Sequence, residues 1–208
     1  ITSFIHNKIS TLKREMVITR LGKNIESANS MQEDGIKKTI EAISGYLELC
    51  RQHKVEKIRA VGTSVFRRAG NRKYFLKRAY EKTGLKIDII SVQEEAKLCF
   101  EGVVKSLQYL DKTVSKIKYS FLRSKKESKK LIVLDIGGGS SELVFGKSDC
   151  SISNIKSIEL GSVTISEKFL NADKAYPQDI SLMNNHITEI LKKELGDIDS
   201  YKDAIIIG

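Results

Sequence analysis

The stretch Asp135-Ile136-Gly137-Gly138-Gly139-Ser140-Ser141-Glu142 decides the fold and the chemistry expected of this chain. The uninterrupted apolar run before it, residues 131–135, is typical of a buried strand. Residues 142–145 continue as a second strand. Three consecutive glycines lose much backbone entropy on folding, so we expect positive φ in the turn or a ligand close to its main chain. The sequence therefore predicts a hairpin with a glycine turn.

The glycine turn is a candidate phosphate site. Successive exposed amides in such a turn form a concavity that binds anions, and the Ser140 hydroxyl adds a donor. Two other phosphate loops are excluded, because the chain has no GxxxxGK[ST] and its glycines lead into a strand instead of opening a helix. A glycine-rich hairpin without a ligand is the alternative, and the third glycine between two acids argues against it.

Two carboxylates flank the turn. Asp135 ends the first strand, and Glu142 lies at the start of the second. Hard carboxylate oxygens beside a phosphate are the ligands that Mg²⁺ prefers. The hairpin therefore predicts a magnesium site at Asp135 and Glu142.

The rest of the chain alternates between strand and helix patterns. Capping boxes are expected at Ser30–Glu33 and Ser91–Glu94, and Gly84 is expected to end a helix. Further strands are expected over residues 2–5, 15–19, 55–61, 86–91, 152–158 and 204–208, and helices over 30–50, 71–83, 91–107 and 179–195. This order predicts an α/β protein with mixed or partly parallel sheets.

Composition narrows the class of protein. A chain of 208 residues with 40% hydrophobic and 30% charged residues is typical of a globular protein of one large domain or two small lobes. No apolar run approaches the roughly 20 residues of a membrane span, and the first residues lack a signal peptide pattern. Three cysteines without metal spacing are read as reduced thiols, so we expect a cytoplasmic protein with no membrane partner.

The positive charge is concentrated. Residues 105–130 carry nine basic and two acidic residues, which is +7 of the net +10. Such a segment attracts phosphate chains, nucleotides or nucleic acids, and a solvated lysine-rich helix or loop is an equal alternative. Residues 108–130 are the expected connection between an N-terminal lobe, 1–107, and the first part of a second lobe, 131–208.

Several of these stretches together resemble one family. Residues 135–142 look like the phosphate-2 hairpin of the exopolyphosphatase/guanosine pentaphosphate phosphohydrolase (Ppx/GppA) family in the actin-like ATPase superfamily. Four further matches follow in the family's order: Arg20-Leu21-Gly22, residues 61–67 (VGTSVFR), residues 90–98 (ISVQEEAKL) and residues 160–163 (LGSV). The resemblance implies an actin-like (ribonuclease H-like) two-lobed fold with mixed sheets flanked by helices.

The resemblance also implies a reaction, the Mg²⁺-assisted hydrolysis of terminal phosphoanhydride bonds of inorganic polyphosphate or guanosine pentaphosphate. Glu95 matches the family's catalytic glutamate, which orients or deprotonates the attacking water, and Arg67 matches an arginine that contacts phosphate. The implied phosphate donors are Gly137, Gly138, Gly139 and Ser140, and the implied metal ligands are Asp135 and Glu142. Glu94 has a structural alternative as the third residue of the capping box, and Glu95 as a first-turn glutamate favoured by the helix dipole.

The sequence also departs from the family. It has no phosphate-1 loop (D-x-G-S-N-x-x-R), and the resemblance predicts a chain incomplete at both termini. Gly62, Val92 and Gln93 stand where the family usually has Ala, Gly and Glu. The alternatives are a non-catalytic module that binds polyphosphate or an alarmone and, less favoured, a sugar or acetate kinase of the same superfamily. Nucleic acid is a less favoured partner through residues 105–130, and a homodimer stays open.

Overall fold

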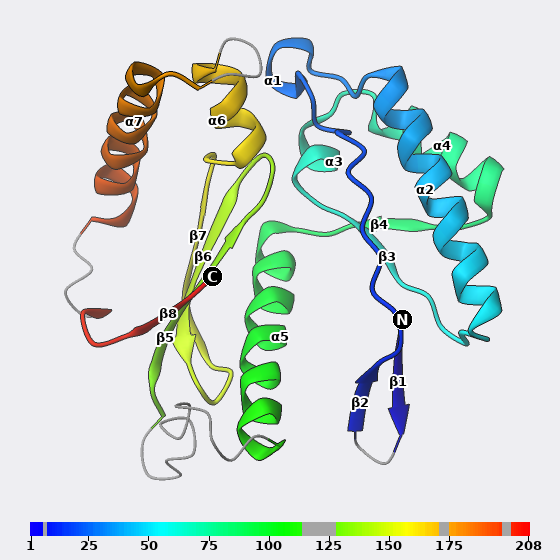
Figure 1. The fold of residues 1–208 in the computed structure, drawn as a ribbon, viewed down its shortest axis with the longest axis horizontal. Helices are drawn as coiled ribbons and strands as arrows, with labels where there is room; N and C mark the ends of the chain where they lie inside the picture. The colour runs from blue at the N-terminus through cyan, green and yellow to red at the C-terminus, as the bar shows by residue number, and fades with distance from the viewer. Residues whose placement is uncertain (6–7, 114–127, 171–174, 197–200) are drawn as a thin grey trace. The chain divides into compact units, whose positions relative to one another are not determined.

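The computed structural model describes residues 1–5, 8–113, 128–170, 175–196 and 201–208 (Figure 1). They form two compact units, residues 1–90 and 91–208. Most of the basic segment 105–130 lies outside the described residues. Within the described ranges the helices are too short or too polar to cross a lipid bilayer.

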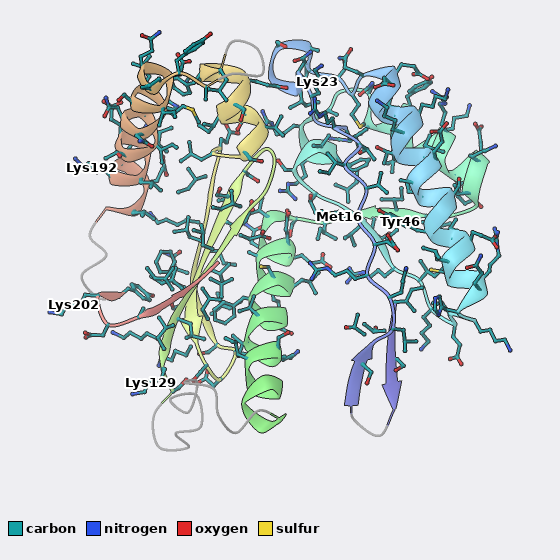
Figure 2. All side chains as sticks on the ribbon, in the orientation of Figure 1. Met16, Lys23, Tyr46, Lys129, Lys192 and Lys202 are labelled. Atoms are coloured by element: carbon teal, nitrogen blue, oxygen red, sulfur yellow. The ribbon has the colours of Figure 1, made fainter. Side chains whose placement is uncertain are left out.

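The first unit combines helices with two small sheets. Its elements are β1 (Thr2–Ile5), β2 (Lys8–Thr11), α1 (Ile25–Ala28), α2 (Glu33–Gln52), β3 (Ala60–Gly62), α3 (Ser64–Arg68), α4 (Arg72–Thr83) and β4 (Ile87–Ile89). β1 and β2 pair antiparallel, whereas β3 and β4 pair parallel. The strand predicted over residues 15–19 is wrong. Because Ile5 already pairs with Lys8, β2 takes up the hydrogen bonds of β1 before residue 15 is reached, and Met16 (Figure 2) is 81% exposed.

The core of the first unit lies between α2 and α4. Ile36 and Ile40 of α2 are buried with Phe75 and Ala79 of α4. The Asn71 side chain accepts from the amide of Met31 and donates to its carbonyl, both at 2.9 Å, which ties the start of α4 to the segment before α2.

Two predictions about helix ends in this unit differ in outcome. The capping box at Ser30–Glu33 does not form, because α2 begins at Glu33 itself, with Gln32 as its N-cap and no side-chain cap bond. Glu33 instead pairs with Arg78 of α4. The helix that ends at Gly84 is confirmed, since Gly84 has the left-handed φ of 68°.

The second unit is built on one sheet. Its elements are α5 (Val92–Thr113), β5 (Lys130–Ile136), β6 (Ser141–Lys147), β7 (Ile152–Ile158), α6 (Ser162–Phe169), α7 (Pro177–Leu195) and β8 (Ile205–Ile207). The strand order is β7-β6-β5-β8 (Figure 1). β5, β6 and β7 are antiparallel neighbours, and β8 runs parallel to β5. The predicted hairpin and mixed sheet are confirmed.

Helices cover both faces of this sheet. Phe100 and Val104 of α5 are fully buried against Leu131 and Val133 of β5. On the other face, α6 and α7 pack around Ile158, and an apolar cavity of about 360 Å³ remains between this face and α7. The compact units therefore divide before α5, at residues 90 and 91, since the apolar face of α5 packs on the second sheet. The predicted lobe boundary at residues 108–130 stays a prediction.

Candidate active site

The register of the sheet brings three polar residues into one row. Asp135 on β5 lies directly opposite Glu142 on β6, and Glu142 lies directly opposite Ser157 on β7. Residues directly opposite each other in antiparallel strands project from the same face of the sheet. Both predicted metal ligands and one serine therefore share a face near the glycine turn.

The carboxylate of Glu142 is held by two hydroxyl groups. Its Oε1 accepts hydrogen bonds from Ser140 Oγ at 2.8 Å and from Ser157 Oγ at 2.9 Å. Glu142 is only 2% exposed, so these donors replace the water that a buried carboxylate would otherwise need. Sequence reasoning missed Ser157, because the signal that identifies it is its register opposite Glu142.

A cysteine on α5 lies among the acidic residues. The charges of Asp135, Glu142 and Glu95 all act on the Cys99 thiol, and Glu95 lies four residues earlier on α5. Burial, followed by the charge of Asp135, raises the pKa of the Cys99 thiol to about 11. The predicted catalytic glutamate and both predicted metal ligands therefore lie within electrostatic range of one thiol. Glu95 itself is half-buried.

The two adjacent glutamates at the start of α5, Glu94 and Glu95, differ in the direction of their side chains. The Glu94 amide donates to Ser91 Oγ at 3.1 Å, which is the predicted cap of this helix. The Glu95 amide donates to the Ser91 carbonyl at 3.0 Å. Successive helical residues project about 100° apart, so Glu94 and Glu95 point in different directions. Glu95 is the one whose charge acts on the Cys99 thiol.

The glycine turn packs against the start of α6. The carbonyl of Gly137 accepts from the Ser162 amide at 2.9 Å, and that of Gly138 accepts from the amides of Val163 and Thr164 at 2.9 and 3.2 Å. These contacts satisfy amides that a helix N-terminus otherwise leaves unpaired. The turn therefore fixes the position of α6.

The expected reason for the three glycines needs correction on one point. Among the described glycines, only Gly84 and Gly196 have positive φ, so the turn does not need glycine for that purpose. An added Cβ would be tight but not impossible at two of the turn's glycines, 3.1 Å from the Ser140 carbonyl oxygen for Gly137 and 3.3 Å from Val163 Cγ2 for Gly138. The glycine that close packing requires is Gly161. A Cβ on Gly161 would lie 2.3 Å from the carbonyl carbon and oxygen of Gly138, because the backbone of α6 comes this near to the turn.

The predicted phosphate donors differ in how they are used. The amide of Gly137 donates to the Ser140 carbonyl at 2.9 Å and closes the turn. For the amides of Gly138 and Gly139, no acceptor is found in the part of the chain that the structure describes. Ser140 is buried, and its hydroxyl donates to Glu142. The two unengaged amides are therefore the stronger candidates for binding phosphate.

Arg67 belongs to the first unit. Its guanidinium Nη1 donates to the Ile90 carbonyl at 3.1 Å, which anchors α3 to the end of β4. The role of Arg67 stays a prediction.

The carboxylate pair fits a magnesium site in which the protein supplies only part of the coordination shell. Over the described ranges, no group of three or more His, Cys, Asp or Glu side chains is arranged to hold a metal. Mg²⁺ in phosphate-processing sites is commonly held by one or two carboxylates, with waters and substrate phosphates completing its shell. Asp135 and Glu142, opposite each other beside the turn, supply this donor set.

Comparisons with known proteins agree on one family for this chain. The model of the Ppx/GppA phosphatase family matches residues 1–202. The bifunctional 3-dehydroquinate synthase/phosphatase of Fusobacterium nucleatum is 31% identical over 176 residues, which cover 82% of this chain and 24% of that protein. Exopolyphosphatase 2 of Mycobacterium tuberculosis is 28% identical over 193 residues, which cover 90% of this chain and 54% of the relative.

A third relative is named as a pyrophosphatase instead of an exopolyphosphatase. The guanosine-5'-triphosphate,3'-diphosphate pyrophosphatase of Photobacterium profundum is 27% identical over 165 residues, 79% of this chain and 29% of its own length. The chain thus spans between about a quarter and just over half the length of these relatives. A solved Ppx/GppA family member from Aquifex aeolicus superposes with a TM-score of 0.64 at 30% identity, over 93% of this chain and 56% of that one. The predicted actin-like (ribonuclease H-like) α/β fold is confirmed.

Proposed function

Because the chain belongs to the Ppx/GppA phosphatase family, we propose that it hydrolyses terminal phosphoanhydride bonds of inorganic polyphosphate or guanosine pentaphosphate. The observation that carries the proposal is the facing pair Asp135 and Glu142 beside the glycine turn. Glu95 lies within electrostatic range of the same thiol, Cys99, as this pair. The names of the exopolyphosphatase and pyrophosphatase relatives support the two substrates.

In the proposed reaction, a water oxygen attacks the terminal phosphorus and the bond to the bridging oxygen breaks. The products are inorganic phosphate and a substrate shortened by one phosphate. Glu95 orients the water and accepts its proton, a role for which a positioned carboxylate is suited. The amides of Gly138 and Gly139 bind phosphate oxygens, as the predicted fork of Arg67 does.

Asp135 and Glu142 are the residues that would hold Mg²⁺. When bound, this ion neutralises charge on the phosphate oxygens, which together with positioning is most of the catalysis in phosphoryl transfer. The two serine hydroxyls on Glu142 are neutral donors, so they orient the carboxylate without cancelling the negative charge that a cation requires.

We also propose a cytoplasmic location, which three free cysteines support. The competing hypothesis is a module that binds polyphosphate or an alarmone without turnover. Inorganic phosphate release from long-chain polyphosphate and from guanosine pentaphosphate, each with Mg²⁺ and with EDTA, separates the two. We expect Mg²⁺-dependent release from at least one substrate. Substrate binding by the folded chain without any release would favour the binding module.

A further inference from the structure

We propose that Ser157 is a positioning residue for the metal-binding carboxylate Glu142. This inference rests on the proposed function, since it assigns to Ser157 the orientation of a ligand to Mg²⁺. It concerns a residue outside the sequence motifs, on a strand that carries no predicted site residue.

The geometry of the row supports this role. Ser157 lies directly opposite Glu142 in the β6–β7 register, and Asp135 lies directly opposite Glu142 in the β5–β6 register. Glu142 is therefore flanked by a hydroxyl donor on one side and by a second carboxylate on the other. The Ser157 hydroxyl donates to Oε1 at 2.9 Å, so it fixes the rotation of the carboxylate from the side away from Asp135.

Both serine donors act on the same oxygen. Ser140 Oγ also donates to Oε1, at 2.8 Å. A carboxylate offers about four lone-pair positions on its two oxygens. We therefore assign the cation to Oε2, the oxygen on which neither serine acts. A carboxylate held in this way loses less orientational freedom when it binds the ion.

Ser157 is the better of the two serines for a test. Ser140 lies in the turn with the candidate phosphate amides, so its substitution would disturb substrate binding as well. Ser157 is exposed on β7 and has no place in the turn. The same strand supplies a matched control, Ser153, which is also exposed and whose hydroxyl donates to the Phe145 carbonyl at 3.1 Å and pairs with the Tyr201 hydroxyl at 2.7 Å.

The test measures Mg²⁺ binding to the substrate-free chain by isothermal titration calorimetry. For Ser157→Ala we expect affinity to fall by roughly 10- to 100-fold, the usual effect of removing a group that orients a metal ligand. Ser157→Thr, which keeps the hydroxyl, and Ser153→Ala should stay within about threefold of wild type. In phosphate release, Ser157→Ala should raise the Mg²⁺ concentration needed for half-maximal rate and leave the rate at saturating Mg²⁺ nearly unchanged.

The outcomes separate the inference from the proposed function. If Ser157→Ala binds Mg²⁺ as tightly as Ser153→Ala, or if the wild-type chain binds no Mg²⁺, the inference is overturned. If Mg²⁺ binds and weakens as expected but no phosphate is released, the inference holds and the hydrolase proposal fails. Urea unfolding of each variant checks that a lower Mg²⁺ affinity does not come from a smaller folded fraction.

Discussion

Asp135 and Glu142 stand directly opposite each other on β5 and β6, so two carboxylates share one face of the sheet. Like charges in opposite positions destabilise a pair of strands. Such a pair lowers the stability of the folded state, and a cation bound by both carboxylates would offset the repulsion.

The first prediction concerns this repulsion. In Mg²⁺-free buffer, Asp135→Asn should raise the free energy of unfolding by about 0.5 kcal/mol, since it removes one of the two facing charges. Mg²⁺ should then stabilise the wild-type chain and have little effect on the variant. Urea unfolding with and without Mg²⁺ measures both effects. Equal stabilisation of the two proteins by Mg²⁺ would contradict the assignment of Asp135 as a ligand.

The packing of the glycine turn on α6 gives a second prediction. Gly161→Ala should lower the free energy of unfolding by about 2–3 kcal/mol. The new Cβ would meet backbone atoms, which cannot move aside as the end of a flexible side chain can. The substitution should also weaken phosphate binding. Gly102→Ala, on α5 with nothing within 4 Å of the added Cβ, is the matched control and should stabilise by about 0.5–1 kcal/mol. A Gly161→Ala chain as stable as this control would refute the close approach.

Cys99 provides a prediction about pH. Thiolates react with iodoacetamide and thiols do not, and the pKa of Cys99 is raised from its ordinary value of 9.0 to about 11 by burial and by Asp135. In a Cys50→Ser/Cys150→Ser background at pH 8, alkylation of the folded chain should be about 100-fold slower than that of the urea-unfolded chain. Equal rates would contradict the raised pKa of the Cys99 thiol and the burial that is its main cause.

The same raised pKa has a consequence for stability. The folded state holds the Cys99 proton more tightly than the unfolded state does, so the stability that Cys99 contributes is present below pH 9.0 and is lost as pH rises through about 11. Cys99→Ser has no group that titrates in this range. Its unfolding free energy should therefore fall less between pH 9.0 and 11 than that of the parent chain.

Local patterns were sufficient to predict much of the second unit. The apolar run of β5, the glycines and the start of β6 lie within one short stretch, so the hairpin and the facing pair Asp135 and Glu142 could be predicted together. The cap of α5 by Ser91 was predictable for the same reason, since its partners are three residues apart.

Features that depend on pairing between distant segments could not be predicted. Ser157 joins the site only because β7 pairs with β6 in one register, and Cys99 only because α5 packs on that sheet. In the first unit, the strand expected at residues 15–19 does not form, because β1 pairs with β2, which follows it more closely in the sequence. The capping box expected at Ser30 does not form because α2 begins only at Glu33. Glu33 pairs instead with Arg78, a residue 45 positions away.

The measurement that tests the central claim most directly compares two adjacent glutamates. Phosphate release from long-chain polyphosphate with Mg²⁺ would be followed for the wild-type chain, Glu95→Gln and Glu94→Gln. We predict that Glu95→Gln lowers the rate by about 10²- to 10⁴-fold, the usual contribution of a positioned general base, while it leaves folding intact. Glu94→Gln, at the helix cap, should keep most of the activity. A Glu95→Gln chain as active as wild type would contradict the account, because the site would then release phosphate without its proposed base.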